Sequence, residues 1–165
     1  MNKYSIRVKV NTEWRTAEVT ATETLLDTLR NKWWTVEVKN GCAQGDCGAC
    51  TVLLQGRPVN ACLVLSVQAD EKEVTTVKGI GTRENPHALQ TAFVEQGAIQ
   101  CGYCTPGMIV SSAALLEKNP DPSRAEISEA ISGNLCRCTG YTKIFRAVED
   151  AARKTNPRTG GRSHG

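Results

Sequence analysis

Residues 42–50 read Cys-Ala-Gln-Gly-Asp-Cys-Gly-Ala-Cys, and this stretch decides how the rest of the chain is interpreted. Its spacing is C-x4-C-x2-C, and a fourth cysteine, Cys62, lies after eleven further residues. Three thiolates on one tight loop can wrap one side of a compact inorganic core, and a fourth from a separate element can complete the coordination. The small residues between the cysteines let the backbone approach and direct its N–H groups toward sulfur. The stretch therefore predicts a metal-binding loop.

This is the spacing that plant-type ferredoxins use to hold a 2Fe-2S cluster. Structural zinc is the first alternative, although zinc sites more often combine two C-x2-C pairs. Disulfides are the second alternative, and they belong to oxidising compartments. The first eight residues contain neither an apolar segment nor a twin arginine, so no signal peptide is predicted and a cytoplasmic protein is expected. Metal-bound cysteines are therefore favoured over disulfides.

A second group of four cysteines follows in the C-terminal half. Cys101 and Cys104 form a C-x2-C pair, and Cys136 and Cys138 form a C-x-C pair after 31 intervening residues. Spacing alone leaves an iron–sulfur cluster, zinc and redox-active thiols open. Both pairs come directly before expected helix starts, at residues 105–106 and 139–142. Because helix N-termini carry partial positive charge, they would stabilise thiolates and an anionic cluster there.

Hydrophobic periodicity divides the chain at about residue 80. Strands are predicted over residues 4–10, 14–19, 51–55 and 73–77, with a short helix capped by Thr22 and a turn over 55–58. From residue 85 onward the pattern is helical, with starts at Asn85-Pro86 and Thr105-Pro106, a capping box from Ser123 to Glu126, and an apolar stripe beginning at Ile144. We predict an α+β protein with a sheet domain over 1–77, a linker over 78–85 and a four-helix domain over 86–153. Residues 154–165 are expected to be a disordered basic tail.

Composition excludes several classes of function. The 165 residues are 40% hydrophobic and 22% charged, which is typical of globular proteins. The net charge of +3 comes from the three basic residues of the tail, so the body has no basic excess with which to bind nucleic acid. No stretch approaches the roughly 20 apolar residues of a membrane-spanning helix.

Three motifs resemble the iron–sulfur subunit of the molybdenum hydroxylases, the family of xanthine dehydrogenase, aldehyde oxidoreductase and carbon monoxide dehydrogenase. They occupy residues 41–52, 100–108 and 133–141, in the family's order, and the resemblance extends over about residues 3–153. It implies a β-grasp ferredoxin-like domain followed by a four-helix bundle, each holding one 2Fe-2S cluster. The implied ligands of the first cluster are Cys42, Cys47, Cys50 and Cys62, and those of the second are Cys101, Cys104, Cys136 and Cys138.

The resemblance also implies partners and further cofactors. The helical cluster would lie next to a molybdopterin held mainly by a large partner subunit, with Gln100 and Cys138 approaching the pterin. The ferredoxin-like cluster would face an FAD-binding medium subunit, and the assembly would be a dimer of heterotrimers. The implied function is a relay of single electrons from molybdenum through two clusters to flavin or another acceptor. Substrate choice would then rest with the partner that holds molybdenum.

Two other functions remain as alternatives from the residues alone. A free-standing two-cluster ferredoxin would shuttle electrons between separate enzymes and would need no large apolar patches, whereas a subunit should expose them. A zinc-held scaffold would have no redox activity.

Residues outside the cysteines have simpler interpretations. Of Trp33 and Trp34, one ring is expected in the core and the other at a subunit contact. Tyr103 and Met108 are expected to pack, His87 to lie in a first helical turn, and Arg137 to tune the cluster or meet a partner.

Overall fold

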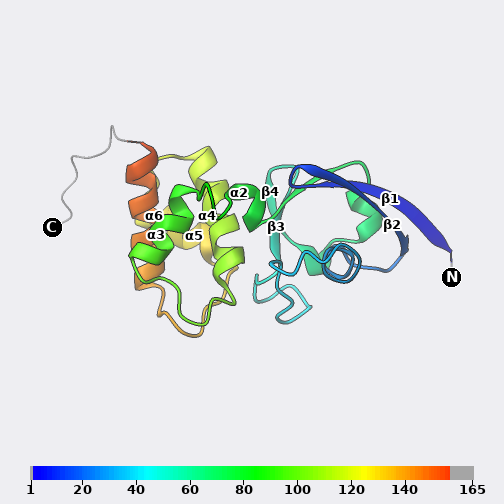
Figure 1. The fold of residues 1–165 in the computed structure, drawn as a ribbon. Helices are drawn as coiled ribbons and strands as arrows, with labels where there is room; N and C mark the ends of the chain where they lie inside the picture. Colours follow the sequence, from blue (N-terminus) through cyan, green and yellow to red (C-terminus); the bar gives the residue numbers. More distant parts are fainter. Residues whose placement is uncertain (1, 157–165) are drawn as a thin grey trace.

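A computed structural model of the chain describes residues 2–156 and combines one sheet with a separate group of helices (Figure 1). The strands are β1 (Lys3–Val10), β2 (Glu13–Thr20), β3 (Thr51–Leu54), β4 (Arg57–Asn60) and β5 (Glu73–Thr75). The helices are α1 (Leu25–Asp27), α2 (Val77–Ile80), α3 (Ala88–Glu95), α4 (Thr105–Lys118), α5 (Arg124–Ile131) and α6 (Thr142–Thr155). A π-helical turn, η1 (Thr28–Lys32), extends α1, and two 3₁₀ turns are η2 (Ala61–Leu63) and η3 (Ser66–Ala69). The predicted α+β class is confirmed.

The five strands form one mixed sheet in the order β2-β1-β5-β3-β4. β1 pairs with β2 in an antiparallel hairpin and with β5 in parallel, while β3 is antiparallel to both β4 and β5. Alternate residues of β1, namely Ile6, Val8 and Val10, are buried, as their period of two requires. They pack against the leucines of α1 and η1, which cover one face of the sheet.

The helical half encloses a second core. Its largest buried side chains include Phe93 of α3, Met108 of α4, Ile127 of α5 and Ile144 of α6, all fully buried. Ser123 caps α5, and the predicted capping box with Glu126 is present. α4 begins at Thr105 with Pro106 in its first turn, as expected from the sequence.

Some predicted boundaries differ from the structure. The cap of the first helix is Thr24 rather than Thr22, because its hydroxyl accepts the N–H of Asp27. α3 begins two residues after Pro86, since Nδ1 of His87 accepts the Leu89 N–H and makes His87 the cap. Residues 57–60 form β4, a strand that the sequence did not predict. The predicted turn over 55–58 overlaps its first two residues.

The ends of the predicted segments also differ. α2 lies across the expected end of the sheet domain and the start of the expected linker, because the Thr76 hydroxyl caps it. α6 continues through Thr155, two residues into the expected tail. The rest of that tail, residues 157–165, lies outside the described residues. Within the described part of the chain, no helix has the length and apolar character needed to cross a membrane.

The two halves meet where β3 packs against α4. Leu53 of β3 and Val110 and Ala114 of α4 form a small buried cluster there. Figure 1 shows α2 and α4 adjacent to β3 and β4, with the β1–β2 hairpin at the far end of the sheet. The strand that follows residues 42–50 is therefore also the strand that contacts the helices.

Candidate metal centres

The first cysteine loop curls tightly around the sulfur of Cys42. Ala43, Gly45 and Gly48 all have positive φ, at 56°, 91° and 65°, which bends the backbone back on itself. The N–H groups of Gln44 and Cys47 donate to the Cys42 Sγ at 3.5 and 3.4 Å. These N–H donors, that of Gln44 first, lower the pKa of Cys42 to about 6. The loop thus stabilises a thiolate, the form that binds metal.

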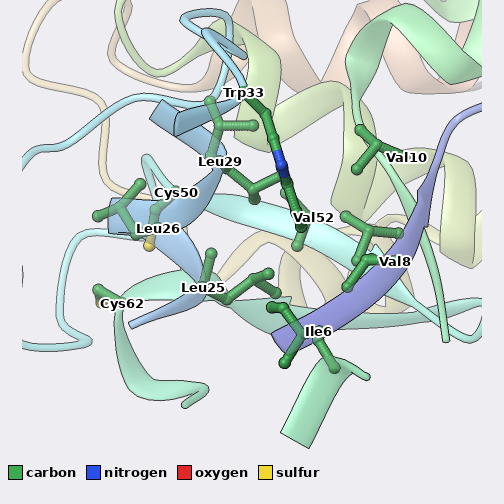
Figure 2. Close-up of a cluster of buried hydrophobic side chains, with 14 of the residues drawn as sticks. Ile6, Val8, Val10, Leu25, Leu26, Leu29, Trp33, Cys50, Val52 and Cys62 are labelled. Carbon is green, nitrogen blue, oxygen red and sulfur yellow. The ribbon is translucent and has the colours of Figure 1, made fainter. Parts of the chain in front are cut away.

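Cys50 and Cys62 lie at the inner side of this loop. Both are buried in the sheet core, in the cluster that contains Leu25 and Leu26 (Figure 2). Cys62 and Cys47 both act electrostatically on Cys50. Burial raises the pKa of Cys50 to about 11. The Cys50 side chain is therefore in an environment that favours a neutral or metal-bound sulfur over a free thiolate.

Strand β4 brings the distant fourth cysteine to the loop. Asn60, the last residue of β4, donates its side-chain N–H to the Gly45 carbonyl at 2.8 Å. Cys62 follows two residues later in η2. Leu63 then covers the loop, since a Cβ on Gly45 would lie only 2.5 Å from its Cδ1. Asn60 and Leu63 therefore hold the segment that contains Cys62 against the loop that contains Cys42, Cys47 and Cys50.

The second group of cysteines lies between helix ends, as the sequence predicts. Cys104 directly precedes α4, and the Sγ atoms of Cys101 and Cys138 are 3.6 Å apart. Burial, and secondly the neighbouring Cys136, raise the pKa of Cys104 to about 12. Burial opposes ionisation of Cys136, but hydrogen bonds from Thr139 outweigh it and lower the pKa of Cys136. The Thr139 hydroxyl and N–H donate to this sulfur at 3.1 and 3.4 Å.

The eight thiols therefore form four pairs, two in each half of the molecule. The pairs are Cys42 with Cys47, Cys50 with Cys62, Cys101 with Cys138, and Cys104 with Cys136. Within residues 2–156, no three or more His, Cys, Asp or Glu side chains are grouped as ligands of a metal ion. Two cysteines on each of two irons is the donor set of a 2Fe-2S cluster, so the paired thiols fit that group.

The two groups differ in their access to solvent. Cys50 and Cys62 are buried, whereas Cys101 and Cys138 are exposed. Gln100, which precedes Cys101, is exposed as well. The predicted pterin-facing residues thus lie together at the surface of the helical half.

A backbone contact joins the two groups. The N–H of Leu135 donates to the carbonyl of Cys47 at 2.9 Å. Leu135 directly precedes Cys136. One backbone hydrogen bond therefore connects Cys47 of the first group to the residue next to Cys136 of the second group. The hydroxyl of Tyr141 supports this segment by accepting the Cys136 N–H at 2.8 Å and donating to the Asn134 carbonyl at 3.3 Å.

Several residues of this region have roles that the sequence pattern does not reveal. Tyr103 is half-exposed and donates its hydroxyl to the Asn40 carbonyl at 2.5 Å, so it links the two halves in addition to packing. Asn134, Thr139 and Tyr141 belong to the third motif, but cysteine spacing assigns them no role. The one sequence feature that could have indicated these roles is position, since each residue lies within three residues of Cys136 or Cys138 and can form short-range hydrogen bonds there.

Met108, Trp33 and Trp34 lie as the sequence predicts. Met108 and Trp33 are buried in their cores, while Trp34 is 77% exposed, so the two indoles do separate as predicted. Glu37 accepts from the Thr76 hydroxyl at 3.1 Å and pairs with Lys78 at 3.3 Å.

Large apolar side chains are exposed in both halves of the molecule. Trp34, Val36, Leu63 and Leu65 are exposed in the sheet half, and Val94, Ile99, Tyr103 and Leu135 in the helical half. Of these, Leu63 lies against the first cysteine loop and Leu135 directly precedes Cys136, so apolar side chains are exposed next to both groups of cysteines. They favour a subunit over a free-standing electron shuttle.

Comparison with known proteins agrees with this architecture. Residues 8–76 match the family of 2Fe-2S iron-sulfur cluster binding domains, and residues 76–149 match a second family of 2Fe-2S binding domains. The two matched segments meet at Thr76, the cap of α2. They correspond to the sheet half and the helical half of the structure.

Individual relatives cover nearly the whole chain. The chain is 50% identical, over 93% of its length and 98% of the relative's, to the small FeS subunit of nicotinate dehydrogenase from Eubacterium barkeri. It is 47% identical, over 91% of its length and 90% of the relative's, to the small subunit of nicotine 6-hydroxylase from Paenarthrobacter nicotinovorans. The crystal structure of quinoline 2-oxidoreductase from Pseudomonas putida 86 contains a chain with a TM-score of 0.89 and 41% identity, covering 95% of this chain and 98% of that one. This chain therefore belongs to the small iron–sulfur subunits of the molybdenum hydroxylases, where it transfers electrons with two 2Fe-2S domains.

Proposed function

We propose that the eight paired cysteines are the ligands of two 2Fe-2S clusters, one in each half of the chain. The first set is Cys42, Cys47, Cys50 and Cys62, and the second is Cys101, Cys104, Cys136 and Cys138. The observation that carries this assignment is the geometry at the sulfurs: N–H groups donate to Cys42 in the first half and to Cys136 in the second, and the Sγ atoms of Cys101 and Cys138 are 3.6 Å apart. Each cluster, when bound, takes up and gives back one electron at a time.

The protein groups around the sulfurs tune that chemistry. N–H donors on Cys42, and the Thr139 hydroxyl and N–H on Cys136, withdraw electron density from sulfur and so favour the reduced cluster. Burial of Cys50 and Cys62 acts in the opposite direction, because added negative charge is less stable away from water. The two sites are therefore expected to have different reduction potentials.

The helical site is proposed to face the molybdenum cofactor of a large partner subunit. Exposure of Cys101, Cys138 and Gln100 supports this orientation, because a redox partner must approach a cluster closely. The Gln100 side chain has both a donor and an acceptor for the polar edge of a pterin. The exposed Leu135 and Tyr103 beside this site would lie in the same interface.

The sheet site is proposed to face an FAD-binding medium subunit, the next acceptor of electrons. Leu63 and Trp34, at 64% and 77% exposed, provide apolar surface on that half for a partner. The complete enzyme is proposed to be a cytoplasmic dimer of heterotrimers. Electrons would enter the chain at the helical half and leave it at the sheet half.

The first experiment is metal analysis combined with electron paramagnetic resonance of the reduced protein, purified natively with whatever accompanies it. We expect four irons per chain, two distinct 2Fe-2S signals, and copurifying molybdenum and flavin. Zinc in place of iron would overturn the ligand assignment. Two clusters without any partner would instead support the free-standing ferredoxin and overturn the proposed assembly.

A further inference from the structure

Asn134 is a buried polar side chain at the boundary between the two halves. It is 3% exposed and lies between the end of α5 and Cys136. Its Nδ2 donates to the Gly48 carbonyl at 2.9 Å and approaches the Thr51 hydroxyl at 3.1 Å. The hydroxyl of Ser111, on α4, donates to Asn134 Oδ1 at 2.7 Å. The amide therefore contacts the cysteine loop, β3 and α4 at once.

The orientation of this amide is fixed by its partners. The Gly48 carbonyl can only accept a hydrogen bond, so the NH₂ group must face it. The Oδ1 atom then faces α4, where the Ser111 hydroxyl supplies the donor. All of the amide's polar atoms thus have partners, and the side chain has one favourable arrangement in this site.

The neighbouring backbone depends on that arrangement. Gly48 and Asn134 are bonded through the Asn134 side chain, and their neighbours Cys47 and Leu135 are bonded through the backbone at 2.9 Å. The Leu135 side chain is 56% exposed, so its own packing contributes little to keeping the Leu135–Cys47 backbone hydrogen bond in place. The anchor of the segment is the buried Asn134 side chain.

The fit around Gly48 leaves no space for adjustment. A Cβ on Gly48 would overlap the Gly133 carbonyl oxygen, and a Cβ on Gly107 would overlap the Gly48 carbonyl oxygen. The loop, α4 and the 133–136 segment are therefore in backbone contact at this point. A change in the Asn134 hydrogen bonds would act on the position of all three.

From these contacts we propose that Asn134 is a positioning residue that sets the spacing and relative orientation of the two cysteine sites. It holds the Leu135 N–H on the Cys47 carbonyl, and so keeps Cys136 of one site close to Cys47 of the other. This role rests on the proposed function, because it concerns electron transfer between the clusters that those cysteines bind. The side-chain amide of Asn134 bonds oxygen atoms and not the cysteine sulfurs, so it acts on the two sites through the backbone.

The test is Asn134→Leu in the full chain carrying both clusters, because leucine has a similar size and no hydrogen bonds. Each reduced cluster alone should keep its g-values and its potential. The magnetic splitting that appears when both clusters are reduced should broaden and decrease, and electron transfer between the clusters should slow. An unchanged splitting, with both clusters present, would overturn the proposal.

Two further variants keep the test decisive. Ser111→Ala removes only the donor that orients the amide, so it should weaken the splitting less but in the same direction. Asn119→Leu is the matched control, because Asn119 lies at the other end of α4 and bonds Glu126 instead. The control should leave the splitting unchanged. If Asn134→Leu fails to take up clusters, a normal splitting in Ser111→Ala overturns the role of the amide.

A second readout does not depend on the clusters. Hydrogen exchange at the Leu135 amide should be slow in the parent protein and faster in Asn134→Leu, while amides of the α6 core, such as Val148, stay protected. Equal Leu135 protection in both proteins would contradict the positioning role. Absence of two 2Fe-2S signals in the parent protein would instead contradict the ligand assignment, so the two failures can be told apart.

Discussion

At the scale of single residues, the sulfurs of the two sites differ mainly in the groups that donate to them. The donors to Cys42 are backbone N–H groups of its own loop, which no substitution other than proline removes. Cys136 instead receives one of its hydrogen bonds from a side chain, the Thr139 hydroxyl at 3.1 Å. The potential of the helical site can therefore be changed by substitution without altering a ligand.

Thr139→Val should make the reduction potential of the helical cluster more negative. Loss of one hydrogen bond worth about 0.5–1.5 kcal/mol corresponds to roughly 20–60 mV for a one-electron couple. Thr139→Ser retains the hydroxyl and serves as the control, and a potentiometric titration followed by electron paramagnetic resonance measures both. A shift of the sheet cluster rather than the helical one would contradict the assignment of Cys136.

A second residue-scale prediction concerns Glu23, at the start of the covering helix. Burial would raise its pKa, but hydrogen bonds from Lys32 and Thr28 outweigh this and lower the pKa below its ordinary value of 4.5. Because the folded-state pKa is depressed, the stabilisation from Glu23 is present above pH 4.5 and is lost as the pH falls through the folded value. Glu23→Gln should therefore reduce stability at neutral pH and flatten its acid dependence. Unfolding by denaturant at neutral pH and in mild acid, in both proteins, provides the comparison.

At the scale of elements, the start of α4 has a glycine where helix propensity would favour alanine. Gly107 lies against the Gly48 carbonyl, which an added Cβ would overlap. In an open helix, glycine to alanine stabilises by about 0.5–1 kcal/mol. Here the methyl group would push α4 away from the cysteine loop.

Gly107→Ala should therefore destabilise the chain by about 1–3 kcal/mol, the usual range for overpacking. Gly133→Ala is the control from the same region, because its Cβ would meet nothing within 4 Å. Thermal unfolding of the two variants side by side gives the measurement. Equal transition temperatures would mean that α4 and the loop are not in tight contact.

At the scale of the whole molecule, two cores support two sites. The sheet core contains Cys50 and Cys62, whereas the helical core is bordered by Cys104 and Cys136. Separate cores imply that one site can be lost while the other persists.

Cys138→Ser tests that independence. Cys138 is exposed and pairs with Cys101, so its loss should remove or alter the helical cluster and leave the sheet cluster intact. Electron paramagnetic resonance and iron content should show about half of the iron lost with one signal retained. Equal loss of both signals in a folded protein would contradict the division into two sites.

The two-part organisation, the cysteine groups and the starts of α4, α5 and α6 could be predicted from the sequence alone. These features are local: thiol spacing, apolar periodicity and capping residues such as Ser123 act over a few residues, so they can be read directly. The β4 strand and the α3 cap were missed or shifted because strand pairing with β3 and the His87 side chain override local turn signals. Only the tertiary structure decided that Leu135 meets Cys47, that Tyr103 reaches Asn40 and that Asn134 joins three segments. Those contacts connect residues far apart in the chain, and they depend on how β3 packs against α4.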